Sequence, residues 1–263
     1  MGSHFDIGYF KKPIKIRAKV AKERTVINKM YAWELGKEYY DGNRLNGYGG
    51  FKYDGRWQKL LPKIIKKYKL TKKSKVLDLG CKKGFLLKDL NILIPGIKSY
   101  GIENHSYALK KAVKCKSKLI LSDYYKIPFK NKYFDFVIAF NSLYMQNLGD
   151  VIKSLKEIER VSKKSFIVLA SGETDEERNK FYRWTLIGTT ILLKKELIEC
   201  IPFSFNEPPT LSKAIVRLLI SKIKLSTFRC VSTISITFWL FLFVSGCFWL
   251  SLVLFLVVSG SGY

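Results

Sequence analysis

Histidine is scarce in this chain, and its cysteines show no regular spacing. Among the 263 residues there are two histidines, His4 and His105, so a histidine-based metal site or catalytic triad is not expected. No C-x-x-C pair occurs, which argues against a zinc site or a disulfide framework and for a reducing compartment. The G-x-G-x-x-G motif of dinucleotide-binding folds is also missing. The sequence therefore predicts no metal site.

Acidic residues are few relative to basic ones. The chain has 38 lysines and nine arginines against 21 acids, a net charge of +26, and its last charged residue is Arg229. A surplus of this size favours an anionic partner, which would be nucleic acid, a phosphorylated substrate or an anionic membrane. Lysine outnumbers arginine about fourfold, so a lysine-rich solvated surface without any such partner is an equal alternative.

Strand and helix patterns alternate along the middle of the chain. Apolar runs predict strands at 75–79, 99–103, 118–121, 134–140 and 165–170. Helical spacing predicts helices at 59–68, at 84–93, from the second strand to about Lys114, and at 151–161. This alternation predicts an α/β fold: a Rossmann-like, doubly wound, mostly parallel sheet with helices on both faces.

Two segments precede the first predicted strand. Residues 1–30 are basic and are expected to form an arm or a surface helix. Residues 33–57 contain many aromatic residues and glycines at 42, 47, 49, 50 and 55, which preclude a continuous helix. We expect this block to form either a lid over a binding cleft or a packed N-terminal cap, and the sequence does not decide between them.

A ligand-binding turn is predicted between Val76 and Gly84, where the sequence reads VLDLGCKKG. The apolar strand closes on Asp78, and Gly80 and Gly84 let the backbone pass close to a ligand at the carboxyl end of the strand. Glu103 ends the second strand, 23 residues after Gly80, close to the spacing of a carboxylate that accepts ribose hydroxyls. Asp123 ends the third strand, where it can accept an exocyclic amine. The three acids together predict a nucleoside-like ligand.

These motifs resemble those of the class I S-adenosylmethionine-dependent methyltransferases, in particular the small-molecule type. VLDLGCKKG looks like the first motif of that family and YGIENHSYAL like the second. SDYYKIPFKNKYFDFVIAFNSLY is similar to its adenine-side segment and fourth strand, and LKEIERVSKKSFIVL to its last helix and strand. The glycine and tyrosine block and ETDEERNKFYRWTL also resemble a bacterial subgroup. The resemblance covers roughly residues 31–199 and implies S-adenosylmethionine as the cofactor.

The resemblance also implies which residues form the site. The cofactor-binding residues it implies are Asp78, Gly80, Cys81, Lys82, Gly84, Glu103, Asn104, Asp123, Tyr124 and Asn141. Lys82 stands where the family usually has glycine or alanine; we expect it to reach the cofactor carboxylate, and obstruction of the turn is the alternative. Asn141 and Ser142 are expected to border the methyl group. Asn141 and Tyr144, the latter where the subgroup often has histidine, are the candidate catalytic residues.

The family pattern fades after about Leu193, and no closing pair of strands is evident. Residues 201–229 predict a proline-broken connector and a basic amphipathic helix at 211–225, lying on an anionic membrane or packed on the sheet. Residues 231–258 are 28 residues without a charge and predict a transmembrane helix. The cations at 222, 224 and 229 place its amino side in the cytoplasm. An altered terminus is the alternative, and the protein would then be cytoplasmic.

Together these features predict methyl transfer from S-adenosylmethionine to a small or lipid-linked acceptor at the cytoplasmic face of a membrane. One alternative is an RNA methyltransferase that uses the basic surface. The other is a non-catalytic, membrane-associated binding module whose pocket is obstructed by Lys82. The oligomeric state is not predicted.

Overall fold

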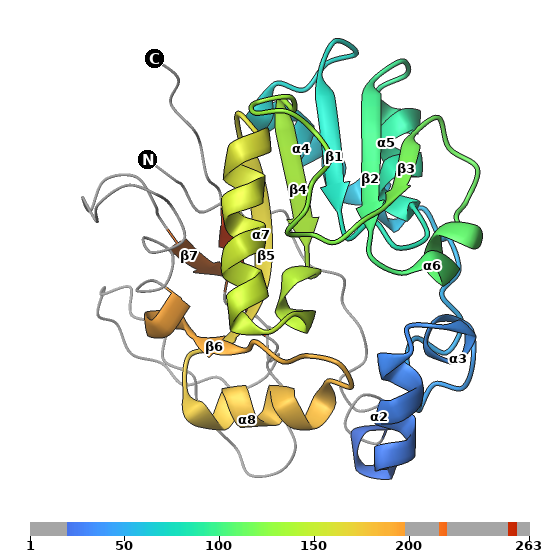
Figure 1. Ribbon diagram of the computed structural model, residues 1–263, viewed down its shortest axis with the longest axis vertical. Coiled ribbons are helices and arrows are strands. Elements are labelled where there is room, and N and C mark those ends of the chain that lie inside the picture. Colours follow the sequence, from blue (N-terminus) through green and yellow to red (C-terminus); the bar gives the residue numbers. More distant parts are fainter. Residues whose placement is uncertain (1–19, 198–215, 220–251, 257–263) are drawn as a thin grey trace, which may run out of the picture.

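A mostly parallel β-sheet forms the centre of the protein. The computed structural model describes residues 20–197 and two further strands at 216–219 and 252–256. The first five strands run parallel to one another: β1 (Lys75–Leu79), β2 (Lys98–Glu103), β3 (Lys118–Leu121), β4 (Phe136–Phe140) and β5 (Ser165–Gly172). Their order, β3-β2-β1-β4-β5, reverses between β1 and β4, the point where ligands bind in doubly wound sheets (Figure 1). The predicted Rossmann-like architecture is confirmed.

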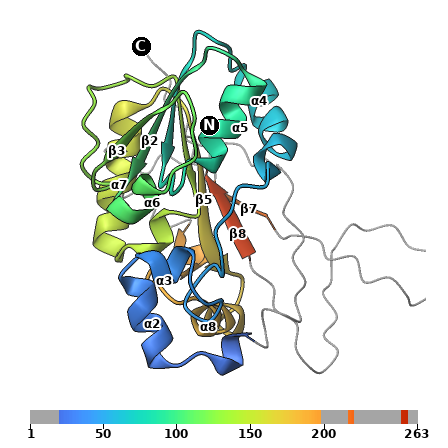
Figure 2. The ribbon, with the colours of Figure 1, turned by 90° about the vertical axis from the view of Figure 1, so that its right-hand side faces the viewer.

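Helices cover both faces of this sheet. α4 (Leu61–Tyr68) and α5 (Phe85–Leu93) lie on one face, and α7 (Leu148–Val161) lies on the other (Figure 2). Successive strand residues point to opposite faces, so Val76 packs in the core beneath α4 and α5 while Leu77 packs in the core beneath α7. The apolar sequence of β1 and β4 follows from this arrangement, because neither face of these strands meets water.

The helix after β2 is shorter than the sequence predicts. α6 spans Ser106–Lys110, whereas the prediction extended to about Lys114. The amide of Val113 donates to the carbonyl of Lys83 at 3.0 Å, in the turn after β1. Because a backbone bonded to that turn cannot continue the helical ladder, the helix ends earlier.

A second, smaller core lies beyond the carboxyl ends of the strands. It contains α2 (Val26–Trp33), α3 (Lys37–Tyr40) and the residues that follow α8 (Asp175–Trp184) (Figure 1). Tyr39 and Tyr40 are buried there with Ala32, Leu186 and Ile187. A short 3-10 helix, η1 (Arg56–Lys59), then leads back to α4, and another, η2 (Leu143–Met145), follows β4. Residues 1–19 of the predicted basic segment 1–30 lie outside the described residues, and residues 26–30 belong to α2.

Two strands near the end of the chain close the sheet. β8 (Leu252–Leu256) pairs antiparallel with β5, and β7 (Val216–Leu219) pairs antiparallel with β8. β6 (Leu192–Leu193) pairs with the last residues of β5. The expectation that no closing pair of strands exists was therefore wrong, as was that of a helix over residues 216–219 and 252–256.

The apolar composition of the tail explains this error. An uninterrupted apolar run, such as the LVLFL of β8, is found in strands that have neighbours on both sides, and a membrane-spanning helix carries the same kind of run. The rest of the predicted transmembrane segment lies outside the described residues. Within the part of the chain that is described, no helix has the length and apolar character needed to cross a membrane.

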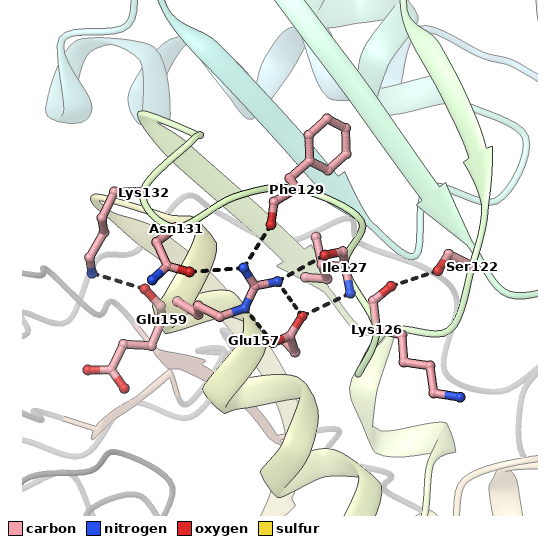
Figure 3. A network of polar contacts seen from close by, with 9 residues as sticks. Ser122, Lys126, Ile127, Phe129, Asn131, Lys132, Glu157 and Glu159 are labelled. Atoms are coloured by element: carbon pink, nitrogen blue, oxygen red, sulfur yellow. Dashed lines mark hydrogen bonds and ion pairs between the residues drawn. The ribbon is translucent and has the colours of Figure 1, made fainter.

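Arg160 on α7 makes hydrogen bonds that hold the connection between β3 and β4 in place. Its guanidinium donates to both oxygens of Glu157 at 2.6 and 2.7 Å, and to the carbonyls of Ile127 and Phe129 at 2.9 and 2.7 Å (Figure 3). Glu157 in turn accepts from the amide of Ile127 at 2.9 Å. The hydrogen bonds from Arg160 hold the pKa of Glu157 below its ordinary value, although burial opposes this. The network satisfies backbone groups of a connection that has no strand or helix partner of its own.

We expect Arg160→Ala to lower the free energy of unfolding by about 2 kcal/mol, because it leaves two carbonyls and a carboxylate without their donor. Urea denaturation measures this change. Lys163→Ala is the control, since the ion pair of Lys163 with Asp135 is largely exposed and contributes at most about 0.5 kcal/mol. Equal losses in the two variants would contradict a structural role for this network.

Candidate functional site

A cleft of about 220 Å³ lies at the carboxyl ends of β1 and β4, where the strand order reverses. Four parts of the chain line it: the turn after β1, the start of α5, the end of β4 with the residues that follow, and residues 48–57. The lining residues are Tyr48, Phe51, Arg56, Trp57, Asp78, Gly80, Cys81, Lys82, Phe85, Leu86, Phe140, Asn141 and Tyr144.

The turn after β1 depends on glycine. The amide of Gly80 donates to the carbonyl of Ile102 at 2.8 Å, and its φ of +84° lies in the left-handed region. A Cβ at this position would lie 2.2 Å from the Cβ of Ser142, so no other residue fits without movement of the backbone. Gly84, with φ of +75°, is the N-cap of α5. These constraints fold the chain tightly between β1 and α5, as the motif predicts.

Asp78 is a buried carboxylate without a hydrogen-bond donor among the described residues. Its side chain is 4% exposed and lines the cleft. Burial raises the pKa of Asp78 to about 7; Lys82 opposes this effect and Glu103 adds to it. A carboxylate held in this way is suited to a cationic ligand group, which would supply the missing donor.

Two cations face the same cleft. The ammonium of Lys82 lies 5.9 Å from the centroid of the Tyr48 ring. Burial alone would lower the pKa of Lys82, but interactions with Tyr48, Tyr144 and Glu103 outweigh it and keep the pKa above its ordinary value. Arg56 is oriented by Asp54, to which its Nε and Nη2 donate at 2.8 and 2.5 Å. Since Lys82 and Arg56 are charged at neutral pH, the cleft also suits an anionic ligand group.

Glu103 holds the turn in place from the end of β2. Its side chain is 1% exposed. One carboxylate oxygen accepts from the amide of Lys82 at 2.8 Å, and the other accepts from the hydroxyl of Tyr124 at 3.0 Å and the amide of Asn104 at 3.1 Å. A carboxylate has about four acceptor positions, so one remains for a ligand.

The structure brings most, but not all, of the predicted site residues together. Those that line the cleft are Asp78, Gly80, Cys81, Lys82, Asn141 and Tyr144. Tyr124 is buried against Glu103, and Ser142 is buried with its hydroxyl donating to the carbonyl of Leu79. The side chains of Asn104 and Asp123 are exposed and do not line the cleft. The expectation that Asp123 converges with Asp78 and Glu103 on one ligand therefore does not hold in this conformation.

Several cleft residues were not singled out from the sequence. Arg56 lies in the glycine and tyrosine block, Phe85 directly follows Gly84, and Phe140 directly precedes Asn141. The rings of Phe51 and Phe85 stack with centroids 4.6 Å apart, and Trp57 meets Phe140 edge-on at 4.8 Å. Their positions next to the motifs were the available signal. The result is a cleft with an aromatic wall.

Residues 36–57, of which 48–57 line the cleft, are bound by polar contacts to the turn after β1 and to α6. Lys83, next to Lys82, donates to Asp41 at 2.5 and 2.7 Å and to the carbonyl of Phe51 at 3.1 Å. Asp41 also accepts from the hydroxyl of Tyr107 at 2.9 Å.

Further along the same segment, Asp89 on α5 anchors residues 53–58. It is fully buried and accepts from the hydroxyl of Tyr53 at 2.5 Å and from the amide of Trp57 at 3.1 Å. A lid and a packed cap both agree with these contacts.

Comparison with known proteins finds a family match in the middle of the chain and solved structures with a similar fold. Residues 77–169 match the family described as "Methyltransferase domain". No curated protein matches the chain in sequence. Among solved structures, the fold is similar to a chain from the complex of the Trm112 methyltransferase activator with a methyltransferase of Haloferax volcanii (14% identity, 90% of this chain and 97% of that chain, TM-score 0.55). It is also similar to a SAM-dependent methyltransferase of Archaeoglobus fulgidus (14% identity, 87% of this chain and 99% of that chain, TM-score 0.53). A third similar structure is the PH0226 protein of Pyrococcus horikoshii OT3 (16% identity, 87% of this chain and 98% of that chain, TM-score 0.51).

The raised pKa of Asp78 predicts an unusual dependence of stability on pH. With ordinary and folded pKa values of 3.8 and about 7, the folded state keeps a proton that the unfolded chain loses between them. The stronger proton binding of the folded state stabilises the protein; this stabilisation is complete below pH 3.8 and is lost as pH rises through 7. We therefore expect Asp78→Asn to be more stable relative to the parent at pH 8 than at pH 5, by urea denaturation at both pH values.

Asp135→Asn is the control, because the pKa of Asp135 is shifted in the opposite direction to that of Asp78. Lys163 and the amide of Lys75 outweigh burial and lower the pKa of Asp135, so its contribution is present above pH 3.8 and is lost as pH falls. This variant should be destabilised relative to the parent at pH 8. An Asp78→Asn effect that does not change with pH would show that the carboxylate is not desolvated.

Removal of the Asp41–Lys83 ion pair would show whether residues 36–57 move as a lid. If they form a lid, Asp41→Asn should increase amide hydrogen exchange in this segment severalfold while exchange in the central strands stays unchanged. Asp54→Asn, which alters an exposed acid of the same segment, is the control for general loosening. Unchanged exchange in Asp41→Asn would identify the segment as a packed cap.

Proposed function

We propose that this chain, which contains a class I S-adenosylmethionine-dependent methyltransferase domain at residues 77–169, transfers the methyl group to a small or lipid-linked acceptor. The observation that carries the proposal is the cleft at the strand-order reversal, which joins a buried carboxylate without a donor, two cations and an aromatic wall. These are the groups that a zwitterionic, positively charged nucleoside requires.

The residues of the cleft fit the parts of S-adenosylmethionine. Asp78 would accept from its ammonium group, and Lys82 and Arg56 would bind its carboxylate. Glu103 can accept one ribose hydroxyl in its remaining position, and a second would displace Tyr124 or Asn104. When bound, the cofactor supplies a methyl group on a positively charged sulfur, which is already a good electrophile.

The chain itself then has to orient the reactants and exclude water. The rings of Phe51, Trp57, Phe85 and Phe140 line the cleft, and aromatic rings attract a cation and exclude water. Alignment of an acceptor in line with the methyl group supplies several kcal/mol. Tyr144 and Asn141 border the cleft after β4 and are the proposed catalytic residues. The carbonyl of Tyr144 accepts from the amides of Thr189 and Thr190, both at 3.0 Å, which fixes its backbone.

A lipid-linked acceptor is supported by the charge of the chain. The net charge of +26 favours a location against anionic lipid. RNA is the second candidate acceptor, because the same charge favours a phosphate backbone. The two differ in that RNA binding is mainly ionic, whereas access to a lipid requires apolar contact with the bilayer.

S-Adenosylmethionine labelled with tritium in the methyl group tests the proposal. Incubation of the full chain with a total lipid extract and, separately, with total RNA should place label in the lipid fraction. Lys82→Gly is expected to weaken cofactor binding about tenfold by calorimetry, because it removes a charged contact with the cofactor carboxylate. The same variant relieves the left-handed backbone at this position, where φ is +52°.

Lys69→Gly is the matched control. It relieves a left-handed residue with φ of +53° at the end of α4, and its exposed side chain lies outside the cleft. This variant should bind the cofactor as the parent does. Absence of cofactor binding by the folded parent would refute the proposed function, tighter binding by Lys82→Gly would show that Lys82 obstructs the pocket, and label in RNA alone would select the second acceptor.

A further inference from the structure

Helix α2 turns its apolar side toward solvent. Five of its eight residues are large apolar or aromatic side chains between 42% and 68% exposed: Val26, Ile27, Met30, Tyr31 and Trp33. They make up most of the exposed large hydrophobic side chains among the described residues. A surface helix normally shows the reverse arrangement, with its polar side in water.

These five residues form one continuous face. Successive helical residues lie about 100° apart around the axis, so the five fall within an arc of about 160°. Ala32 lies outside this arc and is the residue of α2 that is fully buried. The exposed face is therefore a stripe on the outer side of the helix, opposite the side that contacts the protein.

Polar contacts fix this orientation from the inner side. The side-chain amide of Asn28 donates to the side-chain oxygen of Asn46 at 2.7 Å. The side-chain amide of Asn46 in turn donates to the carboxylate of Glu38 at 3.1 Å. Arg24, just before the helix, donates to the carbonyls of Leu45 at 3.0 Å and Trp184 at 2.5 Å. Rotation of the helix to bury its apolar side would break these bonds, so the stripe faces outward because the fold holds it there.

We propose that the outer face of α2 docks on the surface of an anionic lipid bilayer. Lys22, Lys29 and Lys37 are exposed on or beside the helix, and tryptophan and tyrosine favour the interface between water and acyl chains. A second copy of the chain fits less well, because each copy carries a net charge of +26 and the two would repel. Charge complementarity therefore selects an anionic bilayer.

The location of α2 connects docking to the active site. α2 and α3 lie beyond the carboxyl ends of the strands, the edge of the sheet that carries the cleft (Figures 1 and 2). Docking through α2 would bring that edge close to the bilayer, which suits a lipid-linked acceptor. This connection rests on the proposed function, whereas the docking itself does not.

Flotation of the full chain with phosphatidylglycerol–phosphatidylcholine vesicles and with phosphatidylcholine vesicles tests the proposal. The parent should float with the anionic vesicles. Met30→Ser combined with Trp33→Ser should reduce this binding about tenfold or more, since it removes two inserted side chains while keeping every lysine. Ile92→Ser combined with Leu121→Ser, which alters exposed apolar residues elsewhere, should bind as the parent does.

Calorimetry with S-adenosylmethionine on the same preparations separates docking from catalysis. Retained cofactor binding in the α2 variant shows that its fold is intact. Absence of cofactor binding in the parent would refute the proposed function and leave the docking result standing. The docking proposal is overturned if the parent does not float, if both double variants float equally well, or if the α2 variant loses self-association in light scattering instead of lipid binding.

Discussion

The geometry of the candidate site depends on the hydrogen bond between the Glu103 carboxylate and the backbone amide of Lys82. Burial of a carboxylate costs free energy unless donors surround it, and here those donors come from the turn after β1, from Tyr124 and from Asn104. Glu103 thereby joins the ends of β1, β2 and β3 at a single point. The left-handed backbone at Gly80 and Lys82 is held by this bond and by the bond of Gly80 to Ile102.

The adjacent lysines of this turn, Lys82 and Lys83, point in different directions and contact different groups. Lys82 extends into the cleft, where Asp78 and Glu103 share its electrostatic environment. Lys83 points away from the cleft and donates to Asp41 and to the carbonyl of Phe51, so it connects residues 36–57 to the turn after β1. The conformation of one short turn thus sets both the charge inside the cleft and the position of its cover.

The sequence predicts the parallel sheet well because its strands are apolar runs that end at, or just before, a glycine or a polar residue. β1 and β3 have the bounds that their patterns predict. Position along the chain does not reveal which of two neighbouring side chains turns inward, so both Asp123 and Tyr124 were expected in the site, whereas only Tyr124 is buried. Arg56 was missed because its place depends on Asp54 and on the anchoring of the Trp57 amide at Asp89. For β8, periodicity cannot distinguish a strand that consists of one apolar run from part of a membrane helix.

The position of β8 has a consequence for synthesis of the chain. β5 pairs with β4 on one side and with β8 on the other, and 79 residues separate Gly172 from Leu252. While the ribosome produces those residues, the nascent sheet ends at β5 with a row of unpaired backbone groups next to an apolar surface. Such an edge invites pairing with other nascent chains, so chaperone binding during translation would protect this protein more than one whose sheet is complete early.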